Sequence, residues 1–405
     1  MRRAAPVHRG RDIHEAHRVA TPLELLFDLT FVVAIALAAA QLHHGLAEGH
    51  VGPVVVQFLM AFFAIWWAWM NYTWFASAYD NDDLAFRLLT MAQMVGVLIF
   101  AVGVPGIFEG EFAAGVLGYA IMRAALITQW LRAGQGDPER RTTCRRYALG
   151  LGVLQLFWIA RLGCDPAWLL PTFCILAVGE LLVPPWAERA GETPWHAHHI
   201  AERYGLLVII TLGECVLGAA NAVTNLWRAN AANPDVANWS PDLIIVGLGS
   251  MLLVLCLWWM YFLLPSGEAL HHHRERGFAW GYGHFFVFAS LAAMGAGLEV
   301  VADTLNPGVV TPGDAAPPFY AISMVALPMA LFVFAVWALH RHVARAQDRQ
   351  RRLLLACLVC IALVPAAVAG GLALPWALVL LSVGPVIAIA SHERTRRQGP
   401  TLHVQ

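Results

Sequence analysis

The most regular feature of the chain is a series of long apolar runs separated by short polar stretches. A run of roughly 18–25 apolar residues is long enough to cross a bilayer as an α-helix. The pattern predicts an all-α, polytopic transmembrane bundle of about 12 helices, of which the fifth, sixth, eleventh and twelfth are short. The predicted segments are 23–44, 53–76, 84–105, 112–132, 147–163, 167–184, 200–221, 242–264, 279–301, 318–338, 353–369 and 372–390.

The basic residues are distributed unevenly between the two ends of these predicted helices. With the N-terminus inside, nearly all the arginines fall in cytoplasmic segments. Arg161 and Arg228 fall outside, and Arg123 falls within a helix. Cytoplasmic loops of membrane proteins carry such an excess of basic residues. We therefore expect an even number of helices with both termini in the cytoplasm.

Two stretches in the first part of the chain resemble two stretches in the second. FFAIWWAWMNYTWF (62–75) resembles LLVLCLWWMYFLL (252–264), and the Arg-rich loop 130–147 resembles 337–354. Six helices per half would make a parallel repeat, as in some transporters. Aromatic belts and basic loops, which recur in any membrane protein, are the alternative explanation. The expected organisation is a basic tail 1–22, a first half 23–185, a linker 186–199, a second half 200–390 and a tail 391–405.

Composition supports a membrane protein. The chain has 405 residues, of which 59% are hydrophobic and 13% are charged, and its mean hydropathy is +0.60. Soluble domains are about 25% charged. The net charge of −1 says little about partners, because the charges are segregated along the chain, and we expect no nucleic-acid partner. The expected partners are the lipid bilayer and an unknown small-molecule solute, and the oligomeric state, including a homo-oligomer, stays open.

Charged residues inside the apolar runs are the main candidates for chemistry. Glu24 and Asp28 lie four residues apart in the first helix and so share one face. Ionisable groups at mid-membrane cost at least ~2.5–3.5 kcal/mol each, so they need partners. Helix rise places both acids in the inner third of the membrane with three further residues, Arg87, Glu202 and Arg203. We expect a buried ion-pair network in which Asp28 faces Arg87 or Arg203.

Glu214 lies deeper in the membrane than this network, about 20 Å from the inner end of its helix at about 1.5 Å per residue. A carboxyl group there fits a proton carrier. It equally fits a protonated hydrogen-bond donor between helices with a purely structural role. His284 and Glu299, fifteen residues apart on the ninth predicted helix, are further transport or proton-binding candidates. A lone membrane histidine is more often a hydrogen-bonded packing residue.

Motifs for metal, redox or phosphate chemistry are weak. The histidine clusters at 196–199 and 271–273 lack the spacing of a zinc site, and CLVC (357–360) lies in an apolar run. The acidic loop DNDD (80–83) fits a divalent-ion site for a phosphate substrate, or a solvated loop at the start of the third helix. We expect no metal, no cofactor and no catalytic residue.

At these charged positions the sequence resembles the low temperature requirement A (LtrA) family of bacterial membrane proteins. The resemblance rests on PLELLFDLTFVVAIA (22–36), WWAWMNYTWFASAYDNDDLAFRLL (66–89), HHIAERYGLLVIITLGECVLG (198–218) and WWMYF (258–262). Cys215 departs from the small polar residue, such as Ser, that the family pattern leads us to expect. The resemblance implies a polytopic inner-membrane protein associated with growth at low temperature. It marks as motif positions Glu24, Asp28, Arg87, Glu202, Arg203 and Glu214.

Three functions are compatible with this sequence. The first, favoured by two six-helix halves and buried acids, is a secondary transporter of a small solute, with proton coupling through Glu214 or Asp28. The second is a membrane-embedded enzyme that acts on a lipid or isoprenoid-type substrate at the cytoplasmic interface. The third is a non-catalytic stress-response membrane protein.

Overall fold

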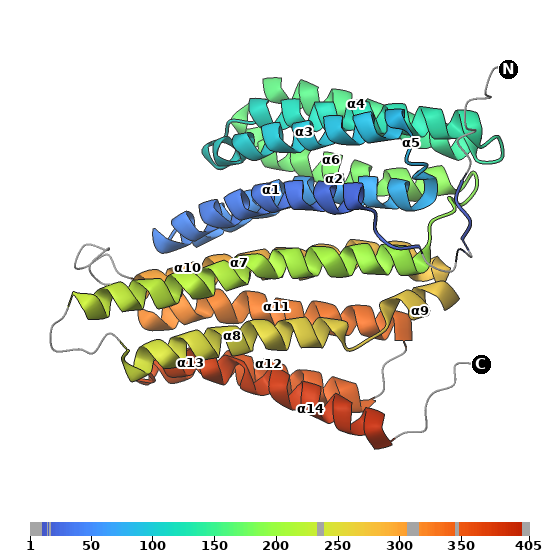
Figure 1. Cartoon of the computed structure of the whole chain (residues 1–405). Helices are drawn as coiled ribbons and strands as arrows, with labels where there is room; N and C mark the ends of the chain where they lie inside the picture. The colour runs from blue at the N-terminus through green and yellow to red at the C-terminus, as the bar shows by residue number, and fades with distance from the viewer. Residues whose placement is uncertain are drawn as a thin grey trace. The chain divides into compact units, whose positions relative to one another are not determined.

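The computed structural model describes residues 10–13, 15, 18–232, 239–305, 316–344 and 348–398, and within these ranges every regular element is a helix (Figure 1). Eleven helical segments of this part of the chain are long and apolar enough to cross a membrane. Helix α5, with 20 residues, is less apolar, and it brings the number of long helical segments to twelve. The prediction of an all-α bundle of about 12 helices is confirmed. The parallel repeat and the orientation of the termini stay predictions.

The helices follow the apolar runs closely, with two differences. The last apolar run is broken into two helices at Ser382, and α7 continues ten residues beyond its predicted end, through the more polar stretch that starts at Asn221. The long helices are α1 (Pro22–Ala47), α2 (Val51–Tyr79), α3 (Leu84–Glu109), α4 (Ala113–Gly136), α5 (Arg141–Ala160), α6 (Leu169–Glu188), α7 (Ala197–Ala231), α8 (Pro241–Phe262), α10 (Gly277–Thr304), α11 (Pro318–Ala344), α12 (Asp348–Ala369) and α14 (Val383–Gln398). The shorter ones are η1 (Arg161–Gly163), η2 (Pro166–Trp168), α9 (Ser266–His272), η3 (Arg274–Arg276) and α13 (Leu374–Leu381).

The chain divides into two compact units, which are described separately. Unit 1 comprises residues 1–38 and 56–204, and unit 2 comprises residues 39–55 and 205–405. The boundaries fall inside α1, α2 and α7, so each of these helices contributes residues to both units. The predicted halves 23–185 and 200–390 stay predictions, and the predicted tails lie partly outside the described residues.

In unit 1, α3 packs along α4, α4 along α5, and α5 along α6. Glycines bring the first pair together: a Cβ added at Gly96 would lie 2.7 Å from the carbonyl oxygen of Gly118, and one at Gly103 would lie 2.6 Å from the Gly115 nitrogen. Small residues allow such close backbone approach in membrane helix pairs. Asp83 caps the start of α3 by accepting a hydrogen bond from the Phe86 amide at 2.7 Å.

The core of unit 1 is aromatic, and α2 supplies most of it. Trp67, Trp69, Tyr72, Phe75 and Tyr79 are all fully buried. Aromatic rings prefer offset-stacked or edge-to-face pairs, and each such pair contributes about 0.5–1.5 kcal/mol beyond its area burial. These rings therefore hold α2 in a fixed rotation, and that rotation sets where the Trp69 indole N–H points.

In unit 2, α10 packs along α11, α11 along α12, and α8 along α13. Gly297 allows the closest approach, because a Cβ there would overlap the Met324 carbonyl of α11. Ser240 caps α8 by accepting a hydrogen bond from the Leu243 amide, with Pro241 in the first helical turn. The membrane-length part of α10 is largely buried, so its polar residues have to find partners inside unit 2.

Candidate functional site

The position of Glu24 is set by the way α1 begins. Thr21 and Glu24 form a capping box: the Thr21 hydroxyl accepts a hydrogen bond from the Glu24 amide at 3.3 Å, and the Glu24 carboxylate accepts one from the Thr21 amide at 2.8 Å. Pro22 occupies the first helical position, where no N–H is needed. The sequence TPLE therefore both starts α1 and orients the Glu24 carboxylate.

Arg203 of α7 lies between the two acids of α1. Its Nη1 is 3.1 Å from Glu24 Oε1, and its Nη2 and Nε are 2.5 and 3.1 Å from the two oxygens of Asp28. All three side chains are fully buried. A planar guanidinium matches this double contact, which a lysine could not reproduce. The four-residue spacing of the acids is thus explained by one arginine that spans both.

Further buried side chains complete this arrangement within unit 1. Asp28 also accepts a hydrogen bond from the Trp69 indole at 2.7 Å, and His199 Nε2 lies 3.2 Å from Glu24. Arg18 Nη2 lies 3.3 Å from Glu24 and 3.6 Å from Asp80. We call this set the α1 charge cluster. Its members are Arg18, Glu24, Asp28, Trp69, Asp80, His199 and Arg203.

The α1 charge cluster is closely balanced in charge. Two arginines face three carboxylates, with His199 as a further donor or acceptor. Removing one partner from a buried ion pair typically costs about 3–5 kcal/mol, because the other charge is left unpaired. At Asp80, which follows α2, burial raises the pKa and the Arg18 guanidinium acts in the opposite direction. The arrangement suits a fixed structural anchor better than a group that gains and loses charge.

Two of the predicted network members lie elsewhere. The placement of Arg87 in the buried network is wrong: its side chain is 53% exposed, and its guanidinium pairs with Asp82 at 2.6 Å. Arg87 lies in the first turn of α3, on a face that is exposed at the surface. Depth in the membrane, which the sequence predicts, does not determine which face of the helix a residue occupies. Glu202 is half-buried and accepts a hydrogen bond from the Ala20 amide at 3.2 Å. Within the described residues no ion pair to Glu202 occurs.

The acidic loop 80–83 is occupied by internal contacts. Asp80 faces Arg18, Asp82 pairs with Arg87, and Asp83 caps α3 while also pairing with Arg132 at 2.8 Å. In the described part of the chain, no group of three or more His, Cys, Asp or Glu side chains is arranged to hold a metal ion. These contacts favour the interpretation of the loop as the start of α3.

Unit 2 contains a second polar group of a different kind, at the crossing of α7 and α10. An added Cβ at Gly295 would lie 2.9 Å from Glu214 Cβ, and one at Gly218 would lie 2.8 Å from Leu298 Cβ. Glu299 follows Gly295 by four residues and therefore lies on the same face of α10. Its carboxylate is near enough to Glu214 for the two negative charges to repel. Its carboxylate accepts a hydrogen bond from the Asn221 amide at 2.5 Å. Both glutamates are half-buried.

The end of α1 that belongs to unit 2 adds to this group. His43 Nε2 lies 2.7 Å from Asp303, which follows Glu299 by four residues on α10. We call Glu214, Asn221, Glu299, Asp303 and His43 the acidic track. Among the described residues no arginine pairs with any of its three carboxylates.

His284 has a structural environment. Its Nδ1 lies 2.8 Å from the Trp280 carbonyl oxygen, which can only accept, so Nδ1 carries the proton. Its Nε2 then accepts from the Tyr261 hydroxyl at 3.0 Å. The ring is buried among Trp280, Tyr261 and Phe288. These contacts fit a histidine with a packing role, and none of them involves a residue of the acidic track.

Several members of the two groups were not recognised from the sequence as site residues. Arg18 lies in the polar stretch before α1, and His199 belongs to a histidine cluster that lacks the spacing of a zinc site. Trp69, Asn221 and Asp303 have ordinary helical settings. A capping box at TPLE was the one readable signal near Glu24. The pairing of His43 with Asp303 joins residues 260 positions apart and has no local signature.

Comparison with known proteins identifies the family. The profile described as bacterial low temperature requirement A protein (LtrA) matches residues 19–387. A curated relative, an uncharacterized protein (RA0937) of Rhizobium meliloti (strain 1021), is 28% identical over 248 residues, which cover 59% of this chain. The matched region spans 57% of that relative's length. No solved structure matches this chain. Because the profile extends over nearly the whole sequence, this multi-pass membrane protein belongs to the LtrA family.

Proposed function

We propose that this protein is a proton-coupled secondary transporter of a small solute in the bacterial inner membrane. Glu214 and Glu299 of the acidic track are the proton-binding groups. The observation that carries the proposal is the composition of the track: three carboxylates with only an asparagine and a histidine as hydrogen-bonding partners among the described residues. Family membership is compatible with this role and does not name an activity.

The physical argument rests on the cost of charge in a low-dielectric environment. Two neighbouring carboxylates repel when both are ionised, so a proton on one of them relieves the repulsion. Intramembrane acids that lack a fixed cation are characteristic of proton relays and cation pathways. An acid clamped by arginine, such as Asp28, does not gain in the same way from taking up a proton. Glu214 and Glu299 therefore suit a reversible role that Glu24 and Asp28 do not.

The proposed architecture gives this site a way to act. Two six-helix halves, 23–185 and 200–390, related by an axis along the membrane normal, would rock to expose a site to either side, with both termini cytoplasmic. The α1 charge cluster would serve as a rigid element of the first half. In this scheme solute export or uptake supports growth at low temperature, the trait in the family's name.

The enzymatic alternative is less well supported. A substrate phosphate at the cytoplasmic interface would need a divalent ion, and the candidate ligands Asp80, Asp82 and Asp83 are already engaged with Arg18, Arg87 and Arg132. The third alternative, a non-catalytic stress-response protein, explains the α1 charge cluster and leaves the acidic track without a role. Transport accounts for both groups.

Two measurements test the proposal. Infrared difference spectra of the purified protein between acidic and alkaline pH should show a carboxyl C=O band that disappears in Glu214→Gln or Glu299→Gln. A second test uses proteoliposomes that contain a pH dye and carry a potassium diffusion potential. When spermidine, choline or ethidium is added, the internal pH should change with wild-type protein and should stay constant with Glu214→Gln. Glu109→Gln, at an exposed carboxyl, is the matched control.

The infrared result decides the site without knowledge of the solute. If the spectra of wild type, Glu214→Gln and Glu299→Gln are the same, neither residue exchanges a proton and the proposal fails. If the band changes and a lipid-modified product accumulates without proton flux, the enzymatic alternative replaces transport.

A further inference from the structure

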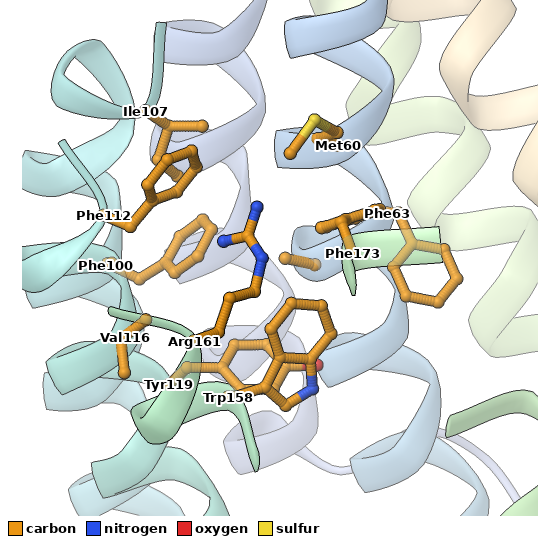
Figure 2. Close-up of a pocket in the computed structure, with 12 residues that line it drawn as sticks. Met60, Phe63, Phe100, Ile107, Phe112, Val116, Tyr119, Trp158, Arg161 and Phe173 are labelled. Atoms are coloured by element: carbon orange, nitrogen blue, oxygen red, sulfur yellow. The ribbon is translucent and has the colours of Figure 1, made fainter. Parts of the chain in front are cut away.

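Unit 1 contains a small cavity, separate from the α1 charge cluster and from the acidic track. It lies among α2, α3, α4, α5, η1 and α6 and has a volume of about 60 Å³. A single water needs roughly 10–15 Å³ on this measure, so the space accommodates a group of several heavy atoms. Its walls are mainly aromatic, as Figure 2 shows. The rings belong to Phe63, Phe100, Phe112, Tyr119, Trp158 and Phe173.

The guanidinium of Arg161 projects into this aromatic space (Figure 2). Its central carbon lies 4.6 Å from the ring centre of Phe112 and 5.8 Å from those of Trp158 and Phe173. The residue is only 4% exposed. Nε and Nη2 donate to the Leu169 carbonyl, at 3.2 and 2.6 Å, and Nε also lies 3.2 Å from the Thr172 hydroxyl. No described residue accepts a hydrogen bond from Nη1.

The other buried arginines of unit 1 show what Arg161 lacks. Arg203 contacts two carboxylates, Arg18 lies 3.3 Å from Glu24, and Arg123 lies 2.9 Å from Glu180. Within the described residues no carboxylate lies within ion-pair distance of Arg161. A buried, uncompensated cation is costly, and aromatic faces offset only part of that cost. The cavity is thus a place where an anion would supply the missing charge.

We propose that this cavity binds the carboxylate of a long-chain aliphatic acid. Arg161 Nη1 donates to the carboxylate, and the rings of Phe112, Trp158 and Phe173 contact the first methylene groups. A carboxylate with a single tail fits the small volume, whereas a phosphodiester carries substituents on both sides of its charge. The inference goes beyond the proposed transport function and does not depend on it. A bilayer is also a natural source of such amphiphiles.

Binding of radiolabelled oleate to the delipidated full-length protein in detergent tests this site. Wild-type protein should bind oleate saturably, and Arg161→Gln should weaken binding about tenfold or more, as expected for loss of one charge-assisted hydrogen bond. Val116→Phe, which fills the cavity and leaves the Arg161 contacts with Leu169 in place, should weaken it comparably. Arg87→Gln removes an exposed arginine and should bind like wild type.

Competing ligands identify the charged group. Methyl oleate has the same tail and no charge, so it should not displace oleate. Phosphatidylglycerol should compete poorly, and competition equal to that of unlabelled oleate would assign the site to a lipid phosphate and overturn the carboxylate assignment. Displacement by methyl oleate, or unchanged affinity in both Arg161→Gln and Val116→Phe, overturns the site itself. If Arg161→Gln does not fold, Val116→Phe decides.

Discussion

The α1 charge cluster and the acidic track both place carboxylates inside apolar helices, and they differ in how the negative charge is balanced. In the α1 charge cluster, each carboxylate lies against an arginine, and the central residues are fully buried. In the acidic track, the carboxylates are half-buried; Asn221 holds Glu299 and His43 holds Asp303. The first arrangement fixes its charges, and the second leaves them able to change.

This difference gives a criterion for separating structure from function in a membrane bundle. A buried ion pair tends to specify one packing arrangement, even where it adds little net stability. An intramembrane acid without a fixed cation lacks this charge pairing, and such acids are characteristic of proton relays and ion pathways, which is why we assign the functional role to it. The criterion places Glu24 and Asp28 with the scaffold, and Glu214 and Glu299 with the proposed transport site.

The largest expected effect is at Arg203. Arg203→Met leaves Glu24 and Asp28 without their shared cation and should destabilise the protein by about 3–5 kcal/mol. Loss of monodisperse protein on size-exclusion chromatography in detergent, with a sharp fall in melting temperature, is the readout. Arg87→Met is the matched control and should leave both unchanged, because Arg87 is exposed. A normal melting curve for Arg203→Met would contradict the structural role of the cluster.

The next comparison is between single acids of the two groups. Asp28→Asn leaves Arg203 with one carboxylate and should cost about 3 kcal/mol, whereas Glu214→Gln should cost less than about 1 kcal/mol. The reason is that Asp28 holds Arg203 and Trp69, while Glu214 faces another acid. Thermal melts of the two variants, prepared in the same detergent, measure the difference. Equal destabilisation would remove the distinction between anchor and site.

A smaller effect is expected at the start of α1. Thr21→Ala removes the hydroxyl of the capping box and should cost about 1 kcal/mol. Thr21→Ser keeps the hydroxyl and should restore most of the stability, which identifies the hydrogen bond to the Glu24 amide as the cause. If both variants melt like wild type, the capping box adds nothing measurable to the contacts of the α1 charge cluster.

The fold was largely predictable from the sequence, because membrane helices are recognised by the length and apolarity of their segments. The twelve predicted segments correspond to the observed long helices, and the main differences lie where polar residues prolong α7 and where the last run breaks at Ser382. These are local balances of helix propensity and packing. Apolar length alone does not determine them.

The site was predictable in part. Helix periodicity brought Glu24 and Asp28 to one face, and depth brought Arg203 to their level. Depth also suggested Arg87, which lies on the surface, because rotation about the α3 axis depends on packing that a single sequence does not reveal. His43 was missed because its partner Asp303 lies 260 residues away in the sequence. Arg18 was missed because it precedes the first predicted helix, where the apolar pattern gives no depth or face.

The smallest effect concerns His196, just before α7. Its Nδ1 accepts a hydrogen bond from the His199 amide, and its Nε2 donates to the Glu15 carbonyl at 3.0 Å. A proton on Nδ1 would break the hydrogen bond from the His199 amide. Burial lowers the pKa of His196 below its ordinary 6.5, with His198 and Arg18 acting in the same direction and Glu15 against it.

The sign of the resulting pH dependence follows from linkage. Below about 6.5 the unfolded state binds a proton that the folded state resists, so stability present at neutral pH is lost as the pH falls. Melting temperature measured from pH 7.5 down to about 5.5 should therefore decline less steeply in His196→Gln than in wild type. His50→Gln, at an exposed histidine, should follow the wild-type slope. An unchanged slope in His196→Gln would show that protonation of His196 does not destabilise the fold, and would contradict this prediction.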